Sequence, residues 1–178
     1  KIFHKDKKKF IRYYKIYINS VSSILNYVGI NINTVPVLDI RRKKSHKIIG
    51  DRSFSNNKST VARLGKICIN CYEKNKIATV MKHIPGHGLS KTDTHLNQSI
   101  VHASKNKLLK KDFYPFKKCK SRFAMTAHIT YSSIDPNNLA THSKILIKKI
   151  IRNHIKFKGI LISDDISMKA IKTPLVQS

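Results

Sequence analysis

The sequence predicts an α/β fold, more specifically part of a (β/α)8 barrel of the TIM type with about four βα units. Segments with apolar residues at helical spacing alternate with short apolar runs, and these runs lack the in-out alternation of a half-exposed sheet. Four of the runs end in polar, chemically capable residues. Functional groups at the ends of successive parallel strands indicate a barrel, because a doubly wound sheet gathers its ligand at one switch point.

The first half of the chain supplies two of these units. Residues 1–9 are rich in lysine and are expected to be frayed. Residues 10–29 carry apolar side chains at helical spacing and predict a helix that stops near Gly29. The β-branched run at 33–40 predicts a strand that ends in Asp39.

A polar loop over 41–57 leads into the next unit. Helical periodicity from about Ser59 to Asn75 predicts a helix, and the apolar run at 77–83 predicts the next strand. A loop that contains Pro85 and several glycines follows and extends to His95.

The second half repeats the alternation. Residues 108–119 predict a broken helix, and the apolar run 123–131 predicts a strand. A turn then leads into an amphipathic helix that begins near Ser143. The run 157–168 predicts the last strand, and a further helix is expected to begin at Met168.

The 178 residues suffice for one domain but not for a complete barrel, which typically needs ~250. The chain starts at a lysine and stops soon after an apolar run. We therefore expect residues 1–178 to form one partial barrel domain that lacks the N-terminal strands and the last strand. Its open sheet edges predict a marginally stable or aggregation-prone protein.

The net charge of +27, from 36 Lys+Arg against 9 Asp+Glu, raises the alternative of a basic nucleic-acid-binding module. Only seven of the basic residues are arginine, the side chain that clamps phosphates and reads bases by its bidentate geometry. Lys, Ile and Asn are also the residues that AT-rich codons supply. We therefore expect no specific nucleic-acid partner, although nucleic-acid binding stays open as the weaker hypothesis.

Metal and membrane functions have little support in the sequence. Cys68 and Cys71 form one C-x-x-C within a helical pattern, and no second pair exists, so two half-buried thiols are expected. His83 and His87 lie four apart, but Pro85 excludes a shared helical face and no third ligand is evident. No apolar run reaches about 18 residues, and the sparse, odd cysteine count suits a reducing compartment.

The acids are few and concentrate where the barrel would have its active face. Five of the nine follow predicted strands: Asp39, Asp51, Asp93, Asp164 and Asp165. Capping or pairing with lysines explains any one of them, but the clustering favours a site. Asp93 and His95 are two apart, so in an extended segment the carboxylate can orient the imidazole. With Asp164 as a nucleophile, this arrangement suits glycoside hydrolysis with retention.

Donor side chains lie nearby in the sequence. Lys82 and His83 end a predicted strand and can donate to hydroxyl or acyl oxygens. Arg52 can hold a ligand oxygen or form a structural ion pair with its neighbour Asp51.

Five ordered stretches carry a family resemblance: "VPVLDI", "IGDRSF", "KHIPGHG" followed by "DTH", "MTAH" and "GILISDDISMKAI". In order and spacing they resemble the family three glycoside hydrolases, specifically the bacterial cytoplasmic β-N-acetylglucosaminidases of cell-wall recycling. The resemblance covers nearly all of residues 15–172. An Asp-Gln-Glu-Gly-Gly-Arg-like motif of the family, which binds the sugar, has no counterpart here.

The resemblance implies a retaining exo-glycosidase without a cofactor, acting on N-acetylglucosamine of muropeptides. It implies Asp164 as the nucleophile and His95 as the acid/base, supported by Asp93, whereas Asp165 stands where relatives have a non-acidic residue. The implied sugar-binding residues are Arg52, Lys82 and His83. An inactive remnant of such an enzyme is the main alternative.

Overall fold

The computed structural model describes residues 6–42, 49–89, 99–168 and 171. Its main sheet is parallel and consists of β1 (Ile32–Asn33), β2 (Ala78–Ile84), β4 (Phe123–Thr126) and β7 (Ile160–Ile162). The order in the sheet, β1-β2-β4-β7, follows the order in the chain. Neighbouring strands that are consecutive and parallel are the arrangement of a barrel wall, so the predicted partial barrel is confirmed.

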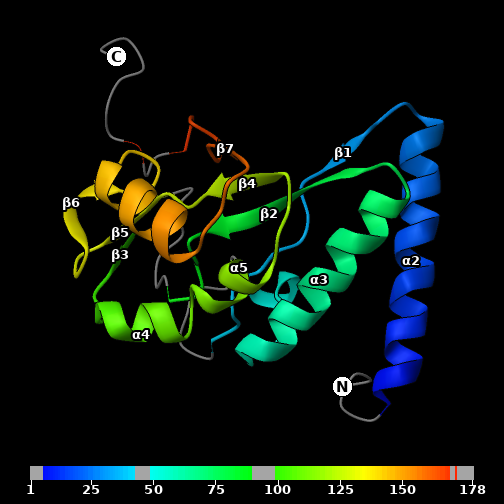
Figure 1. Cartoon of the computed structure of the whole chain (residues 1–178), viewed down its shortest axis with the longest axis horizontal. Coiled ribbons are helices and arrows are strands. Elements are labelled where there is room, and N and C mark those ends of the chain that lie inside the picture. The colour runs from blue at the N-terminus through cyan, green and yellow to red at the C-terminus, as the bar shows by residue number, and fades with distance from the viewer. Residues whose placement is uncertain (1–5, 43–48, 90–98, 169–170, 172–178) are drawn as a thin grey trace.

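Two long helices cover one side of this sheet (Figure 1). Helix α2 (Lys7–Tyr27) is capped by Asp6, whose carboxylate accepts the backbone N–H of Lys9. Helix α3 (Lys58–Lys74) is capped in the same way by Asn57. Figure 1 places α2 outermost, packed against α3, which in turn packs against β2.

The remaining helices are shorter, and α5 (Tyr114–Lys118) packs against α3. The predicted broken helix is two short helices, α4 (Lys105–Lys110) and α5 (Tyr114–Lys118). The helix expected near Ser143 is largely a π-helix, η2 (Leu146–His154), and the Ser143 hydroxyl accepts the N–H of Leu146 at its start. The helix expected from Met168 lies mostly outside the described residues.

Three expectations about the strands and ends were wrong. The helix begins at Lys7, so Lys7–Lys9 are not frayed. The run 33–40 pairs only at β1 and at one bridge between Val37 and Lys82, because Pro36 has no N–H for a continuous ladder. The run 123–131 is two strands, β4 and β5 (Ile129–Tyr131), which belong to different sheets.

A second, smaller sheet of order β3-β5-β6 was not predicted. Strand β3 (Ser99–Val101) runs parallel to β5, and β6 (Asp135–Leu139) runs antiparallel to it. The β6 sequence, "DPNNL", has little strand propensity, so its conformation comes from pairing with β5.

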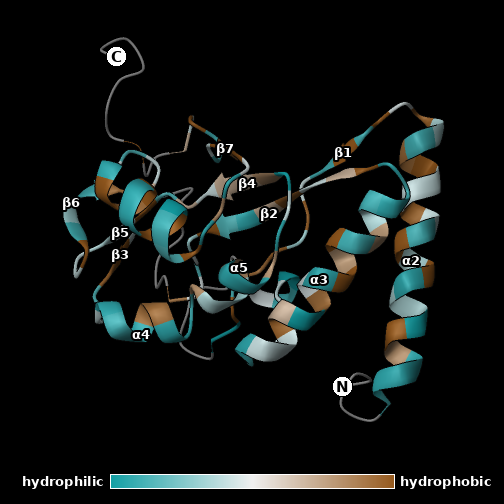
Figure 2. Ribbon diagram, viewed as in Figure 1, coloured by the Kyte–Doolittle hydropathy of each residue, from teal (hydrophilic) through white to brown (hydrophobic). Residues whose placement is uncertain are grey.

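The main core lies between the sheet and the helices and includes Leu38, Met81 and Phe116. A smaller cluster of Ile18, Cys68 and Tyr72 joins α2 to α3. Both thiols are free; Cys71 is partly exposed, as expected, whereas Cys68 is buried and not half-buried. Brown and teal alternate along α2 in Figure 2, because apolar and polar residues alternate in its sequence, and several of its large apolar residues are exposed.

Candidate active site

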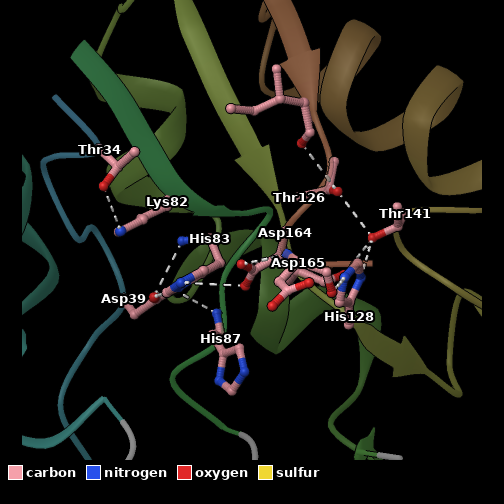
Figure 3. Close-up of polar contacts among 12 residues, drawn as sticks. Thr34, Asp39, Lys82, His83, His87, Thr126, His128, Thr141, Asp164 and Asp165 are labelled. Carbon is pink, nitrogen blue, oxygen red and sulfur yellow. Dashed lines mark hydrogen bonds and ion pairs between the residues drawn. The ribbon is translucent and has the colours of Figure 1, made fainter. Parts of the chain in front are cut away.

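Polar side chains from the ends of neighbouring strands meet in one place (Figure 3). Lys82 and His83 come from β2, His128 follows β4, and Asp164 follows β7. The segment after β1 contributes Asp39. The expectation that the strand ends share one face is therefore confirmed, whereas the chemical roles of the residues stay predictions.

Asp39 is the buried anchor of this group. Its Oδ2 accepts the Nδ1–H of His83 at 2.7 Å and the backbone N–H of His83 at 3.2 Å, and its Oδ1 accepts the N–H of His87 at 2.6 Å. Burial opposes ionisation, but the charge and hydrogen bonds of His83 and His87 hold the pKa of Asp39 below its usual range. A carboxylate held by three donors is a rigid support for the β2 end.

His83 links Asp39 to the predicted nucleophile. Its Nδ1 carries the proton donated to Asp39, and its Nε2 lies 3.7 Å from Oδ2 of Asp164. This separation is longer than a hydrogen bond. His83 thus faces the Asp164 carboxylate with the one ring nitrogen that is not engaged by Asp39.

Asp39 is one of two members of this group, with His128, that sequence reasoning did not select as site residues. Its position at the end of an apolar run was the available signal. This position alone does not reveal the role of Asp39, because the N–H groups that donate to its carboxylate come from residues 83–87.

Lys82 and Arg52 line one cavity of about 480 Å³, together with Thr34. Lys82 donates to the Thr34 hydroxyl at 3.1 Å. Burial and the nearby charge of Arg52 lower the pKa of Lys82, and the carboxylates of Asp164 and Asp39 oppose this shift. Asp51 pairs with Arg41 at 3.1 Å, so its carboxylate does not engage Arg52 in the ion pair that was the alternative to a ligand-binding role for Arg52.

Asp164 and Asp165 play different parts in the turn after β7. The Asp164 side chain is 22% exposed, and its Oδ1 accepts the N–H of Asp165 at 2.9 Å. The Asp165 carboxylate instead accepts the N–H and hydroxyl of Ser167. Of the two, Asp164 is the one that faces the other polar groups (Figure 3).

The loop after β2 is fitted closely to its surroundings. Gly86 has φ +149°, and a Cβ there would lie 2.8 Å from the Asp112 carbonyl oxygen. A Cβ on Gly88 would lie 2.4 Å from the carbonyl oxygen of Ile40. Tyr131 donates to the Gly86 carbonyl at 2.6 Å. The glycines here allow backbone to lie against backbone beside the site.

We expect Gly88→Ala to destabilise the fold by about 1–3 kcal/mol, because the added methyl group forces the loop away from Ile40. Urea unfolding of the purified chain measures the effect. Asn56→Ala, at an exposed loop position, is the control and should change stability by less than about 0.5 kcal/mol. Equal stability of the two variants would contradict the tight packing of this loop.

His87 is buried behind His83, with ring centroids 5.5 Å apart. Burial lowers the pKa of His87 to about 4, although the Asp39 charge opposes the shift. An unfolded histidine titrates near 6.5, so the unfolded state binds more protons between these values. The contribution of neutral His87 to the unfolding free energy is therefore fully present above pH ~6.5, and it is lost as the pH falls from ~6.5 towards 4.

We expect the chain to lose about 3 kcal/mol of unfolding free energy through His87 between pH 7.5 and 4, from the shift of its pKa to about 4. Urea titrations at both pH values measure the loss, and His87→Gln should reduce it. An unchanged pH dependence in His87→Gln would assign the acid sensitivity to other groups.

Asp93 and His95, the predicted acid/base pair, lie outside the described residues. Within the described part of the chain, no group of three or more His, Cys, Asp or Glu is arranged to hold a metal ion. None of the described helices is both long and apolar enough to cross a membrane.

A parallel sheet with carboxylates, imidazoles and a lysine at its strand ends has the layout of a barrel active face. The chain belongs to glycoside hydrolase family 3, since the Glycosyl hydrolase family 3 N terminal domain matches residues 15–178.

Named relatives agree with this assignment. A β-hexosaminidase of Hydrogenovibrio crunogenus is 35% identical over 146 residues, which cover 80% of this chain and 40% of that protein. NagZ from Neisseria gonorrhoeae, in complex with N-trifluoroacetyl-D-glucosamine, matches with a TM-score of 0.86 and 31% identity over 93% of this chain and 50% of that one. A family 3 β-N-acetylglucosaminidase from Paenibacillus sp. matches with a TM-score of 0.86 and 28% identity, over 90% of this chain and 31% of that one.

Proposed function

We propose that this chain carries the catalytic groups of a retaining exo-β-N-acetylglucosaminidase. The observation that carries the proposal is the Asp164 carboxylate, which lies partly exposed at the end of β7 and faces His83. Asp164 is the nucleophile, and His95, assisted by Asp93, is the acid/base. The domain is the partial catalytic barrel, residues 1–178.

The reaction has two displacements. In the first, Asp164 attacks the anomeric carbon while His95 gives its proton to the leaving glycosidic oxygen. In the second, His95 takes a proton from water, the water oxygen attacks the anomeric carbon, and the bond to Asp164 breaks. The configuration at the anomeric carbon is retained, and no cofactor takes part.

The sugar is held by donors near the nucleophile. The charges of Asp164 and Arg52 both act on Lys82, and the cationic groups of Lys82 and Arg52 suit hydroxyl and acyl oxygens. His83 presents Nε2 on the Asp164 side, and Asp39 fixes its ring. Asp39 therefore acts through His83, as a positioning residue.

The relatives support the substrate class. The names of the β-hexosaminidases, and the N-trifluoroacetyl-D-glucosamine bound to the Neisseria protein, favour an N-acetylglucosamine substrate. The natural substrate we propose is N-acetylglucosamine at the end of muropeptides, in the bacterial cytoplasm. The chain spans about 40% of the Hydrogenovibrio relative, so activity of this length of polypeptide is itself part of the proposal.

Release of nitrophenol from a nitrophenyl β-N-acetylglucosaminide tests the function, with a thermal melt as the folding control. Proton NMR of the first sugar released distinguishes retention from inversion. Hydrolysis with retention supports the proposal. A cooperative melt without hydrolysis would identify a folded, inactive remnant instead.

A further inference from the structure

A chain of hydrogen bonds runs beside Asp164 through side chains that the proposed mechanism does not use (Figure 3). Thr126 at the end of β4 contacts Thr141, with 2.9 Å between the hydroxyl oxygens. Thr141 contacts Nδ1 of His128 at 2.8 Å. Nε2 of His128 lies 3.1 Å from the main-chain oxygen of Asp165.

The donors and acceptors in this chain can be assigned by elimination. The carbonyl of Asp165 only accepts, so Nε2 of His128 carries a proton. Burial lowers the pKa of His128, which favours the neutral ring, and Nδ1 is then an acceptor from the Thr141 hydroxyl. Each hydroxyl has one proton: Thr141 can give it to His128 or, at 3.3 Å, to the Ala127 carbonyl, and Thr126 can give it to Thr141 or, at 3.4 Å, to the Ile162 carbonyl. The contacts of Thr141 with His128 at 2.8 Å and with Thr126 at 2.9 Å are the shorter ones and favour a chain from Thr126 to the Asp165 carbonyl.

Two of these side chains, His128 and Thr126, are enclosed by the fold. His128 is 1% exposed and Thr126 is 3% exposed. A buried imidazole with both nitrogens bonded has a fixed ring orientation. His128 thus holds the main chain directly after the predicted nucleophile to the rigid end of β4.

The strand end before Asp164 is also close to this network. The Thr126 hydroxyl lies 3.4 Å from the carbonyl oxygen of Ile162, the last residue of β7. The short segment that carries Asp164 is therefore flanked at both ends by groups of the β4 network. Its Oδ1 is further held by the Asp165 N–H.

We propose that His128 is a positioning residue for the Asp164 nucleophile: through the Asp165 carbonyl it holds the main chain so that the carboxylate faces the site. This role rests on the proposed function. His128 touches neither the substrate nor the reacting atoms, and Thr141 keeps its ring in the required tautomer and orientation.

Two variants separate positioning from a general loss of structure. His128→Leu removes the donor to the Asp165 carbonyl, and His128→Gln keeps an N–H near the position of Nε2. We expect kcat for the nitrophenyl glycoside to fall about 10- to 100-fold in His128→Leu with KM within about twofold, since a small misplacement of a reacting group has effects of this size. His128→Gln should recover most of kcat, and His102→Leu, at an exposed position, is the control.

A second measurement does not depend on turnover. Amide hydrogen exchange of Asp165, followed by NMR, should be at least about tenfold faster in His128→Leu than in His102→Leu if the anchor is lost, because local opening becomes easier. Unchanged Asp165 exchange would overturn the positioning role whether or not the chain hydrolyses the glycoside. Equal kcat values of wild type and an active His128→Leu would also overturn it. If the wild type itself does not hydrolyse the glycoside, that result contradicts only the proposed function.

Discussion

Asp164→Asn should lower kcat for the nitrophenyl β-N-acetylglucosaminide by about 10⁴-fold or more, as expected when the nucleophile of a covalent mechanism is removed. Asparagine keeps the size of the side chain and an oxygen that can accept the Asp165 N–H. The substitution should therefore lower kcat and leave the thermal stability of the fold unchanged. Initial rates of nitrophenol release and a thermal melt of both proteins measure the two effects separately.

The neighbouring carboxylate provides a matched control. Asp165 accepts two bonds from Ser167 and lies outside the proposed chemistry, so Asp165→Asn should keep kcat within about tenfold, the scale of a secondary structural effect. A 5-fluoro N-acetylglucosaminide, which keeps the 2-acetamido group, should trap the covalent intermediate, and mass spectrometry of the labelled peptide locates the bond. Label on Asp165, or full turnover by Asp164→Asn, would contradict the proposed nucleophile.

The sequence predicted the parallel sheet and both long helices because these depend on local periodicity. The pattern over 59–75 matches α3 (Lys58–Lys74) to within one residue at each end. The short sheet around β5 could not be predicted in this way, since "DPNNL" becomes a strand only by pairing with β5. Tertiary pairing there overrides low strand propensity.

Sequence reasoning could find those site residues that lie at the ends of predicted strands. Lys82, His83 and Asp164 were selected for that reason, and the structure brings them together. The supporting groups were harder to find, because their roles depend on partners distant in the chain. His128 depends on the Asp165 carbonyl, 37 residues further on, and Asp39 depends on the N–H of His87, 48 residues away.

Asp39→Asn should reduce the unfolding free energy at pH 7 by about 3 kcal/mol, the scale for removing one member of a buried charged network. The asparagine side chain has one acceptor oxygen, so it cannot serve all three donors from His83 and His87. Urea unfolding of both proteins measures the difference. Asp51→Asn is the control, because the Asp51 side chain is 94% exposed and its pair with Arg41 contributes less than about 1 kcal/mol.

The pH dependence of that difference distinguishes lost charge from lost packing. The pKa of Asp39 is lower in the folded than in the unfolded chain, where it is about 3.9. Its contribution to stability is therefore complete above that value and is lost as the pH falls through the lower, folded pKa. The gap between wild type and Asp39→Asn should hence narrow below pH ~4, the usual aspartate value. If the difference in unfolding free energy between the two proteins stayed constant into the acid range, the carboxylate would stabilise the fold by its shape. Its charge would then not be what holds His83 towards Asp164.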